Sequence, residues 1–221
     1  MENFLYLIDL FLHLDKHLAE VISAYGNLTY VLLFLIIFLE TGLVVTPFLP
    51  GDSLLFAAGA LVPQSDMNIN ILLLGLTLAA ILGDGLNYQF GKFFGAKALN
   101  MGDRWYFKKE YIEKTEKFYQ KYGGKTIIIA RFVPIVRTFA PFLAGVGEMR
   151  YLKFASYNII GAVLWVNSLT LAGYFFGGIE IVKKNFGLVV VAIIILSILP
   201  AVFEIVSQKA QGKKKSLEKS A

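Results

Sequence analysis

One stretch of this sequence, residues 38–59 (FLETGLVVTPFLPGDSLLFAAG), limits what the chain can fold into. It is strongly apolar, yet it carries two carboxylates, Glu40 and Asp52, and two prolines, Pro47 and Pro50. Each proline removes a backbone donor and clashes with the preceding turn. A single continuous helix therefore cannot pass through this stretch.

The break predicts a helical hairpin. We expect a turn at residues 46–52, which includes Gly51, and a second helix that begins at Ser53 with Asp52 as its cap. Each arm has roughly 12 to 18 residues and reaches about 18 to 27 Å, whereas the hydrocarbon core of a bilayer is about 30 Å thick. One arm is too short to span it. The hairpin is therefore predicted to be re-entrant, with its tip buried in protein or lining a wet cavity.

Residues 126–147 (TIIIARFVPIVRTFAPFLAGVG) repeat this pattern, with Pro134 and Pro141 at the tip of a second predicted hairpin. Three residues follow their counterparts by 87, 87 and 86 positions: Pro134 after Pro47, Arg137 after Pro50, and Gly145 after Gly59. Downstream, the sequence GKFFG at 91–95 is echoed 82 residues later by GYFFG at 173–177. These offsets predict an internal duplication.

The two copies carry complementary charges. The first contains Glu40 and Asp52, and the second contains Arg131 and Arg137. Four ionised groups facing lipid would cost on the order of 10 kcal/mol, so these groups must pair or line a hydrated cavity. Repeated broken helices with a site at their interface are typical of membrane transporters.

Composition supports a membrane protein, because 57% of the residues are hydrophobic and the mean hydropathy is +0.63. The predicted fold is an all-α polytopic membrane protein with two inverted repeats, each a re-entrant hairpin plus a transmembrane helix. Residues 1–221 form one membrane domain with six segments: an amphipathic helix (1–27), repeat 1 (28–91), a basic segment (92–125), repeat 2 (126–177), a last transmembrane helix (186–206) and a basic tail (207–221). Whether residues 3–24 span the membrane or lie in its interface stays open.

The positive charge fixes a predicted orientation. Residues 92–125 hold nine Lys or Arg against four acidic residues, and the tail is also basic. The positive-inside rule places both in the cytoplasm and the loop at 63–70 outside. Because this charge flanks apolar segments, we expect it to contact membrane lipids and not nucleic acid. The chain has no cysteine, which excludes disulfides and thiolate metal sites.

Two further polar pairs lie outside the hairpins. Asp84 and Asn87 share one face of a predicted span, and that face should point inward. They either make a helix-packing hydrogen bond or belong to a transport path. His13 and His17 are four residues apart, but no third ligand is apparent, so we predict no metal and no cofactor.

The residues ETGLVVTPFLPGDSLLFAAGAL, GGKTIIIARFVPIVRTFAPFLAGVG and those from Tyr157 to Gly177 resemble the bacterial DedA family, and the likeness covers nearly the whole chain. The resemblance implies an inner-membrane protein with a VTT-type domain, related to lipid scramblases. It also implies recycling of a polyprenyl phosphate carrier such as undecaprenyl phosphate, driven by the proton motive force. The family's functional acidic and basic positions match Glu40, Asp52, Arg131 and Arg137.

We therefore expect a transporter of an anionic lipid and not an enzyme. Arg131 and Arg137 would bind the phosphate, because guanidinium forks match its oxygens. Glu40 and Asp52 would compete for these arginines or carry a coupling proton. One alternative is structural: buried ion pairs that join the hairpins, with Asp52 mainly a cap. Others are a proton-coupled carrier of small solutes or ions and, more weakly, an intramembrane lipid phosphatase. The oligomeric state stays open.

Overall fold

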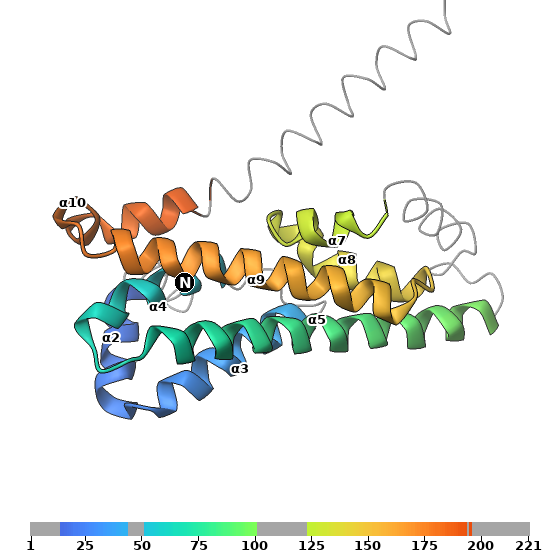
Figure 1. Cartoon of the computed structure of the whole chain (residues 1–221), viewed down its shortest axis with the longest axis horizontal. Helices are drawn as coiled ribbons and strands as arrows, with labels where there is room; N and C mark the ends of the chain where they lie inside the picture. The colour runs from blue at the N-terminus through green and yellow to red at the C-terminus, as the bar shows by residue number, and fades with distance from the viewer. Residues whose placement is uncertain (1–13, 44–50, 101–122, 194, 196–221) are drawn as a thin grey trace, which may run out of the picture.

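The computed structural model describes residues 14–43, 51–100, 123–193 and 195 (Figure 1). All regular structure in these residues is helical, which confirms the predicted all-α class. The helices are α2 (Leu14–Tyr25), α3 (Leu28–Gly42), α4 (Gly51–Leu61), η1 (Val62–Gln64), α5 (Ile69–Asn100), α7 (Lys125–Ala130), α8 (Pro134–Val146), α9 (Tyr151–Phe176) and α10 (Glu180–Lys184). The predicted tip residues Pro47 and Pro50, His13 and the basic tail lie outside the described residues.

Two long helices, α5 and α9, form the centre of the molecule and run antiparallel beside each other (Figure 1). Each contains a 26-residue segment long and apolar enough to cross a membrane, Ile69–Phe94 and Tyr151–Phe176. One face of α5 carries an exposed stripe of large apolar side chains: Ile71, Leu74, Leu78 and Leu82. In water such a stripe would promote aggregation, whereas in a bilayer it faces lipid.

The predicted breaks separate short helices. In the first copy α3 has 15 residues and α4 has 11, and every residue of α4 is buried. In the second copy α7 has only 6 residues and α8 has 13. A helix buried at all positions cannot face lipid. The burial of α4 therefore supports a hairpin whose second arm is enclosed by protein.

Several boundaries differ from the prediction. Helix α4 begins at Gly51, so Asp52 lies in its first turn and is not the residue before a helix that starts at Ser53. A carboxylate in the first turn is still stabilised by the positive end of the helix dipole. Helix α5 continues to Asn100, so the first part of the predicted basic segment is helical.

The second break also differs from the first. Pro134 takes the first position of α8, where its missing N–H costs nothing, and Val133 before it is extended. Pro141 lies inside α8 and not at the tip, so this part of the prediction is wrong. An internal proline removes one helical hydrogen bond, and membrane helices tolerate it where neighbouring helices pack closely. Helix α8 packs along α5 and so provides that support.

The packing of glycines matches the predicted duplication. Four glycines abut a backbone carbonyl of the other copy with no room for a Cβ atom: Gly59 against Thr170, Gly173 against Phe56, Gly145 against Tyr88, and Gly91 against Phe142. Each residue in these contacts has a counterpart in the other copy: Gly59 and Phe56 match Gly145 and Phe142, 86 positions later, and Tyr88 and Gly91 match Thr170 and Gly173, 82 positions later. Replacing every residue by its counterpart turns the first two contacts into the last two. Two copies related by a local two-fold rotation make such contacts. Since α5 and α9 are antiparallel, this arrangement supports inverted repeats.

Candidate functional site

The first cluster of buried charges centres on Arg137, in the first turn of α8. Its Nη1 donates to Asp52 Oδ1 at 2.5 Å, and its Nη2 donates to Glu40 Oε1 in a second, short hydrogen bond. Glu40 lies near the end of α3, and its Oε1 also accepts from the backbone N–H of Gly51 at 3.2 Å. A Cβ atom at Gly51 would collide with this carboxylate. One arginine thus joins both arms of the first hairpin to the second.

Trp165 completes this cluster from α9. Its Nε1 donates to Asp52 Oδ1 at 2.9 Å, and its ring centroid lies 4.9 Å from Arg137 Cζ. The side chain is fully buried. The sequence analysis did not place Trp165 in the site. The signal that could have found it is its position amid an apolar span, because a buried indole N–H needs a polar partner.

The second cluster centres on Arg131, the cap residue directly after α7. Its Nη2 donates to Asp84 Oδ2 at 2.6 Å, to the carbonyl of Ala80 at 3.1 Å, and to Asn158 Oδ1 in a short hydrogen bond. The Arg131 and Asp84 side chains are only 3% and 4% exposed. Asn158 Nδ2 in turn donates to the carbonyl of Ile81 at 3.0 Å. This network joins α7 to α5 and α9, and Asp84 is the ion-pair partner of Arg131.

Asn87, predicted together with Asp84, has a different environment. Its Nδ2 donates to the carbonyl of Thr41 at 3.1 Å and to that of Thr138 at 2.8 Å. These bonds fasten α5 to the end of α3 and to α8. They are of the helix-packing kind, which is one of the two alternatives that the sequence left open.

The two clusters border one small cavity. Its lining includes both arginines, Glu40, Asp84 and Trp165, and its volume is about 10 Å³. That is close to the smallest space that holds one water molecule. Within the described part of the chain, Glu40 Oε2 and Arg131 Nε are buried without a hydrogen-bond partner. Both residues belong to the lining of the cavity.

Among the described residues of the site, the formal charges do not balance. Three carboxylates (Glu40, Asp52 and Asp84) surround two guanidinium groups, whereas the sequence analysis assigned two of each to the site. Removing one partner of a buried ion pair typically costs about 3 to 5 kcal/mol, because a buried charge is left uncompensated. One excess negative charge in such a site therefore favours uptake of a proton or a cation.

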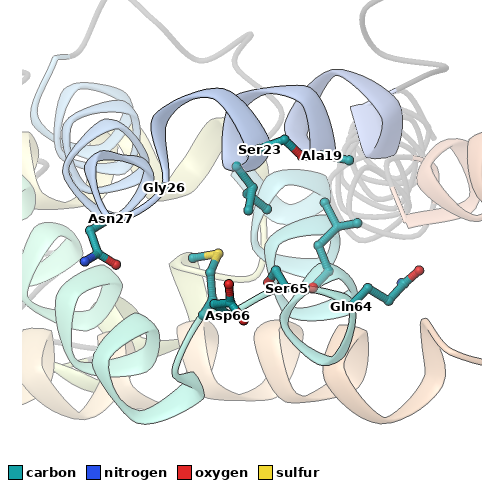
Figure 2. Close-up of a pocket in the computed structure, with 10 residues that line it drawn as sticks. Ala19, Ser23, Gly26, Asn27, Gln64, Ser65 and Asp66 are labelled. Carbon is teal, nitrogen blue, oxygen red and sulfur yellow. Dashed lines mark hydrogen bonds between the residues drawn. The ribbon is translucent and has the colours of Figure 1, made fainter.

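A larger cavity of about 510 Å³ lies between the end of α2 and the link from α4 to α5. Ser23, Asn27, Gln64, Ser65 and Asp66 surround it in Figure 2. Among the described residues, its lining includes one carboxylate, Asp66, and no cationic side chain. This chemistry does not favour a phosphate, so the arginine clusters are the better candidate for an anion site.

The described residues contain no group of three or more His, Asp or Glu that could hold a metal ion. His17 lies 3.7 Å from Glu20, measured between Nδ1 and Oε2. His13 is outside the described residues, so the predicted absence of a metal site stays a prediction.

These features define a helical membrane protein with paired charges buried between broken helices. The VTT domain family matches residues 49–175. Protein DedA of Escherichia coli (strain K12) is 55% identical over 211 residues, covering 95% of this chain and 96% of that protein. Inner membrane protein YqjA of the same strain is 34% identical over 158 residues, or 72% of each chain. The chain therefore belongs to the DedA family of VTT-domain membrane proteins.

A further relative is the Mycobacterium tuberculosis (strain ATCC 25618 / H37Rv) protein named uncharacterized membrane protein Rv0364. It is 43% identical over 181 residues, covering 81% of this chain and 79% of that protein. No solved structure matches the chain. Membrane location and family membership are thus shown, while the function has to be inferred from the site.

Proposed function

We propose that this protein transports an anionic lipid across the bacterial inner membrane, with a polyprenyl phosphate such as undecaprenyl phosphate as its cargo. The observation that carries the proposal is Arg137, a guanidinium buried among apolar helices and shared between two carboxylates. A guanidinium fork binds phosphate oxygens as it binds carboxylate oxygens. A phosphate can therefore take the place of Glu40 and Asp52.

The exchange requires movement. The cavity of about 10 Å³ is too small for a phosphate group, so the carboxylates must withdraw before Arg137 can bind one. Withdrawal leaves buried negative charge, and a proton removes that charge. Glu40 is the proposed proton carrier because its Oε2 is buried and lacks a partner among the described residues. This step couples phosphate binding to proton uptake.

We propose the same orientation that the charge pattern predicts. Residues 92–125 and the C-terminal tail face the cytoplasm, and the hairpins enter the membrane from opposite sides without crossing it. Two observations support this arrangement: α4 is completely buried, and the close glycine contacts between the two copies follow a local two-fold rotation. The protein then acts as a transporter and not as an enzyme.

Binding in detergent tests the cargo. Farnesyl phosphate, a short polyprenyl phosphate, should bind the purified protein, whereas farnesol should not, and inorganic phosphate should compete only weakly. Equal competition by inorganic phosphate would favour a carrier of small ions instead. Release of phosphate from the lipid by pure protein would favour a phosphatase. Absence of farnesyl phosphate binding would refute the proposal.

A further inference from the structure

Arg131 and Arg137 differ in how their partners hold them. Arg137 uses two separate nitrogens for two carboxylates, and its side chain is 10% exposed. Arg131 uses one nitrogen, Nη2, for three acceptors: Asp84, Asn158 and the carbonyl of Ala80. An Nη nitrogen carries two hydrogens, so Nη2 of Arg131 has none left for a phosphate. Arg131 Nε still has one unpartnered hydrogen, but it cannot form a two-nitrogen fork to a phosphate without Nη2.

We propose that Asp84 and Asn158 are positioning residues that hold Arg131 back from the substrate, so that Arg137 alone exchanges its carboxylates for a phosphate. This inference rests on the proposed function. It gives Asp84 and Asn158 a role that the sequence pattern did not assign. It also makes Arg131 a fixed part of the wall of the site instead of a second phosphate ligand.

The packing around Arg131 supports a fixed position. Its side chain passes close to Gly161 of α9, where a Cβ atom would lie 2.8 Å from Arg131 Cδ. Arg131 is also the cap residue after α7, two positions before Val133, the extended residue that precedes α8. Movement of the guanidinium would therefore disturb the break between α7 and α8 as well as the bonds to α5 and α9.

Reserving one arginine suits a transporter. A carried ion must bind well enough to enter a site and weakly enough to leave it. Two free guanidiniums would hold a phosphate through two charge-assisted forks, and release would be slow. With Arg131 neutralised by Asp84, the phosphate meets a single exchangeable cation.

Two variants test the inference by binding of farnesyl phosphate and by melting temperature in detergent. Asp84→Asn removes the charge partner, so the unliganded protein should melt at a lower temperature while Arg131 becomes available to the ligand. We expect roughly tenfold tighter binding, the gain of one charge-assisted hydrogen bond. The ligand should also raise the melting temperature more than in the wild type.

The matched control is Asp84→Asn combined with Asn158→Asp. It moves the carboxylate to the other acceptor of Arg131 Nη2, from α5 to α9, and keeps the total charge. Melting temperature and affinity should both return towards wild-type values. The double variant also keeps a carboxylate beside Arg131, which makes the test possible if Asp84→Asn alone does not fold.

Weaker binding by Asp84→Asn would overturn the inference, because Arg131 or Asp84 would then contribute to the phosphate site directly. A double variant that folds but regains neither property would also overturn it, since Asp84 would be needed at its own position. If the wild type binds no farnesyl phosphate, the proposed function fails. The melting temperatures still decide whether Asp84 acts through Arg131.

Discussion

Arg137→Lys separates a phosphate ligand from a purely structural cation. Lysine keeps the charge but presents one compact ammonium, so it cannot bridge Asp52 and Glu40 as the two Nη atoms of Arg137 do. The unliganded protein should lose one charge-assisted hydrogen bond, about 1.5 to 3 kcal/mol. It should also lose part of the contact with Trp165, about 0.5 to 1 kcal/mol.

The affinity change is smaller than the sum of these losses. A phosphate bound to the lysine of this variant would also miss one of two hydrogen bonds, but the unliganded variant has already lost one, and the two losses partly cancel. We therefore expect binding of farnesyl phosphate to weaken by roughly tenfold, at the low end of the range for a charged hydrogen bond. Titration calorimetry and thermal unfolding on the same preparation measure both effects.

Arg150→Lys is the matched control, because Arg150 is exposed at the start of α9 and lies outside both clusters. It should change neither affinity nor melting temperature. A lower melting temperature with unchanged farnesyl phosphate affinity in Arg137→Lys would refute the reasoning. The charges would then be structural ion pairs, the alternative that the sequence left open.

Three further predictions address the second contact of the site, the packing and the topology. Trp165→Phe removes the indole N–H while keeping a ring, so it should weaken proton-driven transport in proteoliposomes with only a modest fall in melting temperature; full activity would contradict a role for that N–H. Gly91→Ala should destabilise the protein strongly because its Cβ would strike a backbone carbonyl, whereas Gly75→Ala in the same helix meets nothing and should be neutral or slightly stabilising in thermal unfolding. Single cysteines at Asp66 and Arg150, both exposed, should react with a membrane-impermeant reagent from the periplasm and the cytoplasm respectively, and labelling from the same side would contradict the inverted hairpins.

Local chemistry in the sequence predicted the breaks in the helices and the residues that needed partners. Prolines end or start helices for steric reasons that do not depend on the rest of the fold, and Pro134 accordingly begins α8. The same rule wrongly placed Pro141 at the tip of the hairpin. Pro141 lies inside α8, where packing against α5 compensates for the lost helical hydrogen bond. Charges in an apolar stretch had to pair or line a hydrated cavity, and Glu40 and Arg137 form an ion pair.

The sequence could not predict which carboxylate pairs with which arginine. The partners of the two arginines are 27 to 97 positions away along the chain, and their meeting depends on how α5, α8 and α9 pack. Asp84 was placed on an inward face, but nothing local linked it to Arg131. Periodicity can give the face of a helix, whereas the partner on that face comes from the tertiary arrangement.

The glycine contacts obey the local two-fold relation of the copies, but the charges do not. All three carboxylates of the site come from the first copy, and both arginines come from the second. The ion pairs therefore cross the boundary between the copies, and a rocking motion of one copy against the other would break them. Protonation of a carboxylate weakens such a pair, and a phosphate replaces the carboxylate as the partner of an arginine. In the proposed transport cycle, the proton and the phosphate both act on the ion pairs that hold the copies together. Binding of either one can therefore change which side of the membrane the site opens to.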